Sequence, residues 1–173
     1  MRRDRRDRQA AASAGDHEPM GRSQVPKSEF VYVTYIKTTP DTLWNALTDP
    51  EAMKQWRFGT HAESDWSVGS SWKMITEAGQ ILDTGEIAES NPPTRLSIKW
   101  RNEWKPELKA EGYSRCTFDI EPVSGNATKL TVTHAIDKNP SQFIEAVSIG
   151  WPKTLSNLKT FLETGETVLE GTR

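Results

Sequence analysis

His134 is the residue of this sequence best suited to proton transfer. It ends the alternating run Leu130, Val132 and His134, so its side chain is predicted to face inward with the two aliphatic ones. A neutral imidazole inside a cavity can orient a ligand or exchange a proton near neutral pH. The alternative is a core histidine satisfied by a backbone carbonyl group at the strand end. An enzymatic role also requires a buried acid within hydrogen-bond distance of the imidazole.

Other catalytic chemistry is weakly represented in the sequence. Cys116 alternates with Phe118 and Ile120, which predicts a buried, inert thiol rather than a nucleophile. Three His and one Cys form no zinc-binding spacing. The phosphate-loop, dinucleotide-binding, HExxH and GxSxG motifs are absent. We therefore expect no catalytic residue, no metal and no cofactor.

Three charged residues, Asp83, Glu86 and Arg115, lie on predicted strands and can line a polar corner of a cavity. Arg115 has the parity opposite to that of Phe118. It is therefore expected to be a solvent-facing cation that can pair across strands. None of the three is predicted to be catalytic.

Aromatic residues dominate the candidate binding surface, since seven Trp residues lie between positions 44 and 151. Cavities lined by apolar and aromatic groups are the usual sites for small molecules. Core packing is the alternative for the predicted inward-facing Trp residues. The predicted ligand-binding residues, chosen by strand parity, helix stripe or loop position, are Trp72, Trp100, Trp104, Phe118, His134, Trp151 and Leu155.

Trp104 lies in the segment 101–112, RNEWKPELKAEG, whose charges alternate in sign. A polar connection that carries a single Trp is typical of a mobile loop over a cavity mouth or at a partner surface. The alternative is a solvated hairpin whose Trp folds back onto the sheet.

The elements that must position these residues follow from periodicity and turn signals. Residues 29–36 predict a strand, and the cap and Pro patterns at Thr39 and Asp49 predict short helices over 39–47 and 49–56. Between residues 60 and 134, turn signals separate segments of period two, which predicts an antiparallel meander.

A long amphipathic helix is predicted after Pro140. It ends at Gly165, and Pro152 predicts either a kink near 150–152 or a helix start there. The fold class is α+β, with a curved antiparallel sheet and the long helix across its concave face. The apolar positions of the helix recur at spacings of three or four: Ile144, Val147, Trp151, Leu155, Leu158 and Leu162.

Composition limits the remaining possibilities. The net charge is −2, no apolar run is long enough to span a membrane, and no secretory signal is visible, so we expect a cytoplasmic protein that binds neither nucleic acid nor membrane. The Arg-rich segment 1–26 is expected to be a disordered tail, with translation able to start at Met20. Residues 27–166 then form one domain, followed by a C-terminal tail, 167–173.

Four stretches resemble the bacterial homologues of the activator of heat shock protein 90 ATPase. They are FVYVTYIKTTPDTLWNALTDPEAMKQW (30–56), GEIAESNPPTRLSIKW (85–100), LTVTH (130–134) and GWPKTLSNLKTFLETG (150–165). The resemblance implies the helix-grip fold of the START-related (SRPBCC) superfamily. It covers about residues 29–166. Residues 1–26 are too short for the additional amino-terminal domain with which the eukaryotic activator binds the chaperone.

The resemblance implies several functions, because the superfamily includes hydrophobic-ligand carriers, cyclases and regulatory modules. We expect a non-catalytic module that binds a small hydrophobic molecule between sheet and helix, with a stress-related or regulatory role. A cyclase-like or hydrolase-like enzyme in the same cavity is the second hypothesis. The third is an interaction module for a chaperone or transcriptional regulator. A homodimer is compatible with all three.

Overall fold

The structure, a computed structural model, describes residues 25–171 of the chain. Almost all of the predicted disordered tail 1–26, including the alternative start at Met20, lies outside the described residues. The elements are β1 (Ser28–Ile36), α1 (Pro40–Thr48), α2 (Pro50–Trp56), β2 (His61–Ser64), β3 (Ser71–Ile75), β4 (Ile81–Asn91), β5 (Arg95–Asn102), α3 (Pro106–Lys109), β6 (Ser114–Val123), β7 (Ala127–Ile136) and α4 (Gln142–Thr164).

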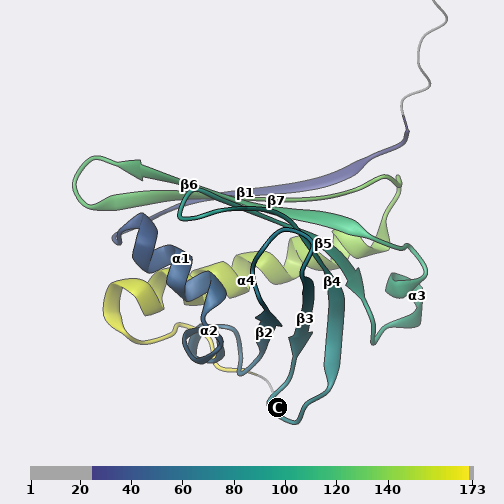
Figure 1. Ribbon diagram of the computed structural model, residues 1–173, viewed down its shortest axis with the longest axis horizontal. Helices are drawn as coiled ribbons and strands as arrows, with labels where there is room; N and C mark the ends of the chain where they lie inside the picture. The colour runs from purple at the N-terminus through teal and green to yellow at the C-terminus, as the bar shows by residue number, and fades with distance from the viewer. Residues whose placement is uncertain (1–24, 172–173) are drawn as a thin grey trace, which may run out of the picture.

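The strands form one seven-stranded sheet in the order β1-β7-β6-β5-β4-β3-β2. All neighbouring pairs are antiparallel. Figure 1 shows the sheet curving around α4, with α1 and α2 on the same side as this helix. This arrangement confirms the predicted α+β helix-grip fold.

The strand faces predicted from the period of two are confirmed. Cys116 pairs with both Ile98 and His134 in neighbouring strands, so equivalent positions of β5, β6 and β7 share the concave face. Their side chains form the core beneath α4. The buried members of this face are Leu96, Ile98, Trp100, Cys116, Phe118, Ile120, Leu130, Val132 and His134.

The two short helices begin where the sequence predicts. The Thr39 hydroxyl accepts from the backbone N–H of Thr42 at 3.2 Å, and the Asp49 carboxylate accepts from that of Ala52 at 2.8 Å. Each cap is followed by a proline at the first helical position. Helix α2 ends at Trp56, and the C-cap residue Arg57 donates its backbone N–H to the Met53 carbonyl oxygen.

Helix α4 runs without interruption through Pro152, so the alternative in which the helix starts near residue 150 is wrong. Ser141 provides an earlier start, because its hydroxyl accepts from the backbone N–H of Ile144 at 3.1 Å. The predicted end is confirmed, since Gly165 adopts a left-handed conformation with φ of 81°.

The segment 101–112 is not an irregular loop throughout, since it contains α3. Leu108 of α3 is buried. The Glu111 carboxylate accepts from the Ser141 hydroxyl at 2.6 Å and from the backbone N–H groups of Gln142 and Phe143 at 2.8 and 3.2 Å. A negative charge at the positive end of α4 is favourable, so the segment is fastened to that helix rather than free over the cavity.

The C-terminal residues 167–171 lie against α4. The Asn157 side chain accepts from the backbone N–H groups of Val168 and Leu169 and donates to the carbonyl oxygen of Leu169. The described part of the predicted tail 167–173 therefore packs on the domain.

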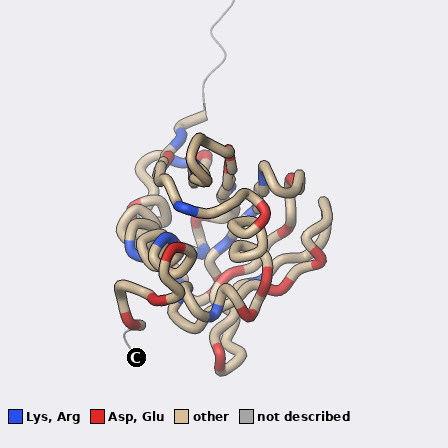
Figure 2. Tube along the Cα trace, turned by 90° about the vertical axis from the view of Figure 1, so that its left-hand side faces the viewer, with Lys and Arg blue, Asp and Glu red and all other residues tan. Residues whose placement is uncertain are grey.

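The surface charges are mixed. Figure 2 shows Lys and Arg (blue) interspersed with Asp and Glu (red) over the trace. Within residues 25–171, no helix is both long and apolar enough to cross a membrane. The expectation that the protein does not bind nucleic acid stays a prediction.

Candidate functional site

A cavity of about 230 Å³ lies between the concave face of the sheet and α4, beside α3. Its wall is largely aromatic and aliphatic, but two cationic side chains and one carboxylate also reach it. The lining residues are Arg57, Asp83, Trp100, Asn102, Trp104, Lys105, Leu108, Phe143, Ala146, Val147, Gly150, Trp151 and Thr154.

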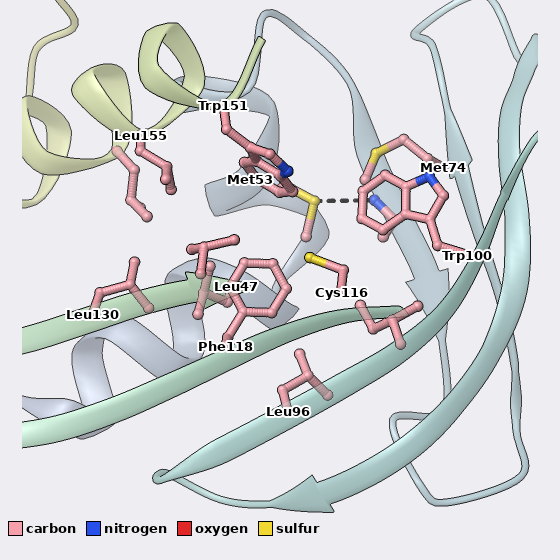
Figure 3. Close-up of a cluster of buried hydrophobic side chains, with 14 of the residues drawn as sticks. Leu47, Met53, Met74, Leu96, Trp100, Cys116, Phe118, Leu130, Trp151 and Leu155 are labelled. Atoms are coloured by element: carbon pink, nitrogen blue, oxygen red, sulfur yellow. Dashed lines mark hydrogen bonds between the residues drawn. The ribbon is translucent and has the colours of Figure 1, made fainter. Parts of the chain in front are cut away.

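A second, inner chamber of about 20 Å³ lies deeper in the core. Arg57 and Trp100 line both spaces, so these two side chains stand between the outer cavity and the inner chamber. The inner chamber is also lined by Trp72 and Phe118. Figure 3 shows this part of the core, with Trp151 directed from α4 toward the sheet that carries Trp100 and Phe118.

Arg57 is the unusual residue of the site. Its guanidinium carbon lies 5.8, 5.6 and 5.1 Å from the ring centroids of Trp56, Trp100 and Trp151. Burial lowers the pKa of Arg57, and the charge of Asp83 opposes this shift. Because arginine stays protonated in proteins, the site holds a permanent positive charge stacked among aromatic rings.

No ion pair among residues 25–171 includes Arg57. Its hydrogen bonds are made by the backbone, whose N–H donates to Met53 and whose carbonyl oxygen accepts from Thr60. The sequence interpretation did not identify Arg57. The only available signal was a cation that directly follows a predicted core tryptophan at a helix end.

Asp83 lines the outer cavity and accepts from the Asn102 amide at 3.2 Å. Burial raises the pKa of this carboxyl, while the Trp100 side chain and the charge of Arg57 oppose the shift. The other two charged candidates lie elsewhere. Glu86 is exposed. Arg115 faces solvent, as predicted, and pairs across strands with Glu89 at 3.7 Å, although Glu89 lies on β4, on the far side of β5.

His134 is fully buried and held by two side chains. The Trp151 indole N–H donates to its Nδ1 at 3.1 Å, and its Nε2 lies 2.8 Å from the Ser114 hydroxyl. Because Nδ1 accepts, the proton of the neutral ring is on Nε2 and is donated to Ser114, whose own hydroxyl donates to the Trp100 carbonyl oxygen at 3.0 Å. The chain of donors and acceptors is therefore complete.

Burial, and to a smaller extent the charge of Arg57, lowers the pKa of His134 to about 3. The imidazole is neutral at physiological pH and fastens α4 to the sheet. The predicted partner, a backbone carbonyl group, is wrong, because Ser114 and Trp151 fill that role. No acid is among the hydrogen-bond partners of His134 in the described chain.

The structure distributes the predicted ligand-binding residues over three regions. Trp100, Trp104 and Trp151 line the outer cavity. Trp72 and Phe118 line the inner chamber, as does Trp100. His134 and Leu155 are buried but line neither space.

A curved antiparallel sheet that holds a long C-terminal helix, with an apolar cavity between them, defines a helix-grip protein of the START-related class. Residues 37–163 match the family described as Activator of Hsp90 ATPase homolog 1-like protein, and the chain belongs to this family. The resemblance found in the sequence is thereby confirmed. A search among curated proteins found no match.

Solved structures of the same fold come from distant organisms. A protein of Mesorhizobium loti is 22% identical, with a TM-score of 0.67 over 78% of this chain and 96% of that one. The Aha1 dimer of Colwellia psychrerythraea is 21% identical, with a TM-score of 0.64 over 80% and 98%. An Hsp90 activator of Plasmodium falciparum is 27% identical, with a TM-score of 0.60 over 77% and 92%.

Proposed function

We propose that this protein is a non-catalytic module that binds a small hydrophobic molecule between the sheet and α4, in a stress-related or regulatory role. The observation that carries the proposal is the cavity of about 230 Å³, whose wall includes Trp100, Trp151, Phe143 and Val147. Concave, mostly apolar spaces with a few polar groups are the usual form of a small-molecule site.

The His134 imidazole and the Cys116 thiol do not line this cavity. Both ring nitrogens of His134 are engaged by protein partners. Cys116 is fully buried, and burial raises the pKa of its thiol. These placements favour binding over proton transfer or nucleophilic attack by these residues.

The first test is native mass spectrometry of the protein purified from cells of its own source, compared with its denatured mass. An added mass of small-molecule size that is lost on denaturation supports the proposal. The bare chain, with no added mass, contradicts it.

Gly150→Leu tests whether the bound molecule occupies this cavity. Gly150 lines the cavity, and a Cβ there meets no atom outside its own helix within 4 Å. The new side chain fills the cavity and removes a helical glycine, so we expect loss of the added mass with thermal stability retained. The control is Ile149→Ala, on the exposed side of the same turn, which should retain the added mass. Retention of the small molecule by Gly150→Leu would place it elsewhere.

A second copy of the chain is a further candidate partner, favoured by the edge strand β1. Val31, Val33 and Tyr35 on its outer side are 50, 47 and 55% exposed. Exposed apolar groups on an edge strand are typical of an association surface. The relative from Colwellia psychrerythraea is described as a dimer. Sedimentation equilibrium should show a dimer that Val33→Lys weakens, and a monomeric wild-type protein would contradict this candidate.

A further inference from the structure

We propose that the molecule bound in this cavity is an amphipathic carboxylate, whose anionic group binds Arg57 and the indole N–H of Trp72 while its apolar body occupies the outer cavity. This inference rests on the proposed function and names the chemical class of its ligand.

The first supporting observation is the unpaired charge of Arg57. Its guanidinium group lies among three tryptophan rings, with no carboxylate of the described chain within ion-pair distance. Aromatic faces stabilise the cation but accept none of its in-plane hydrogen bonds in the way a carboxylate does. Arg57 is half-buried, and a cation that is partly withdrawn from water without an ion-pair partner reduces stability, which an anionic ligand offsets.

The second observation is independent of charge. Trp72 is 2% exposed, and its indole nitrogen Nε1 is buried without a hydrogen-bond acceptor. Buried indole N–H groups normally have a partner. Trp72 and Arg57 line the same inner chamber, whose volume of about 20 Å³ is enough for one water-sized group. A carboxylate oxygen is of that size and accepts from both donors.

The charges around the cavity also favour an anion. Lys105 adds a second positive charge to the lining, whereas Asp83 is the one carboxylate among the lining residues. Asp83 accepts from the Asn102 amide, and burial raises the pKa of its carboxyl while the charge of Arg57 opposes that shift. Because the charge of Asp83 acts on Arg57, its removal should strengthen the binding of an acid.

The test compares two acids, 2-naphthoate and decanoate, with the amides of the same skeletons. Binding to the full chain is measured by calorimetry at pH 7. We expect each acid to bind at least about tenfold more tightly than its amide, because hydrogen bonds to charged groups are worth more than neutral ones. In the Arg57→Met variant, affinity for the acid should fall about tenfold or more, while affinity for the amide stays within about twofold.

Three further variants distinguish binding at Arg57 and Trp72 from a nonspecific attraction of the anion to positive charge. Lys153→Met removes the same charge from the exposed side of α4 and should leave the affinity for 2-naphthoate unchanged. Asp83→Asn should increase that affinity. Trp72→Phe should weaken it several-fold, and in the wild-type protein the Trp72 indole ¹H–¹⁵N resonance should shift with 2-naphthoate and not with 2-naphthamide.

The outcomes distinguish the inference from the proposed function. Equal binding of acids and amides, or equal losses for both in Arg57→Met, overturns the carboxylate inference while the binding module stands. Weaker acid binding by Asp83→Asn also overturns it. Failure of all four compounds to bind the wild-type protein contradicts both proposals. A thermal unfolding curve for Arg57→Met close to that of the wild-type protein establishes that the variant is folded.

Discussion

His134, which is fully buried, and Arg57, which is half-buried, are two polar groups that pack against the same pair of tryptophans. The His134 ring centroid lies 5.3 and 6.2 Å from those of Trp100 and Trp151, and the Arg57 guanidinium carbon lies 5.6 and 5.1 Å from them. Their hydrogen bonding differs completely. Both ring nitrogens of His134 have protein partners, whereas the Arg57 guanidinium forms no ion pair within residues 25–171.

The difference separates a structural group from a binding group. A buried polar side chain with every partner in place holds elements together, and little of it remains available to a ligand. A partly buried charged side chain that lacks an ion-pair partner remains available to a ligand that supplies one. His134, although histidine is a common catalytic residue, therefore has a structural role here, and Arg57 is the candidate binding residue.

Removal of the imidazole should have the largest effect on stability. His134→Ala deletes a fully buried side chain and leaves the Trp151 indole N–H without its acceptor. We expect a loss of about 2–4 kcal/mol in the free energy of unfolding, measured in urea, with affinity for 2-naphthoate retained. Ser114→Ala removes only the second partner and should cost about 1 kcal/mol. Loss of affinity with stability intact would instead make His134 part of the site.

The pH dependence of stability tests whether His134 is a buried, neutral imidazole. The pKa of His134 is about 3 in the folded protein and about 6.5 in the unfolded chain. Between these values the unfolded chain binds a proton that the folded protein does not. Stability should therefore be complete above pH 6.5 and fall toward pH 3, with a slope approaching about 1.4 kcal/mol per pH unit.

The window from pH 6.5 to 4.5 separates His134 from carboxylates whose pKa is lowered. The salt-bridged Glu103, for example, has a pKa of about 2 and loses its contribution only below its ordinary value of 4.5. The readout is the difference between wild type and His134→Gln in urea midpoints across this window. A difference that does not vary with pH would refute the buried neutral imidazole.

Arg57 should behave in the opposite way. Arg57→Met replaces a half-buried cation that forms no ion pair in the described structure with an apolar chain of similar length, so the ligand-free protein should keep its stability or gain up to about 1 kcal/mol. Urea unfolding of ligand-free protein measures this. A loss above about 2 kcal/mol would show that the stacking on Trp56, Trp100 and Trp151 outweighs the cost of desolvating the charge.

The sequence predicted which side chains of a strand or helix face inward better than it predicted which of them line the cavity. The alternation of Leu130, Val132 and His134 placed all three inward, as the structure confirms, because strand parity follows from backbone geometry. Neither strand parity nor the apolar stripe of a helix distinguishes a core position from a cavity wall. Leu155 and Trp151 share the stripe of α4, but only Trp151 lines the cavity.

Two features depended on contacts between distant segments and were missed. The alternating charges of 101–112 indicated a loop, but Glu111 binds the start of α4 and Leu108 is buried. Arg57 belongs to no local pattern. Its role as a candidate binding residue depends on tryptophans from three elements and on the absence of an acid partner in the described structure. Such constellations arise only from tertiary structure.

Trp104 gives the smallest predicted effect and tests how far the binding region extends. It is 51% exposed yet lines the outer cavity beside Lys105. Trp104→Ala should change the free energy of unfolding by less than about 0.5 kcal/mol, because an exposed side chain contributes little to the core. Affinity for 2-naphthoate should fall a few-fold as the rim of the apolar wall is lost, while Trp104→Phe retains most of it. Unchanged affinity and unchanged oligomeric state in Trp104→Ala would remove Trp104 from the site and confine binding to the Arg57 end of the cavity.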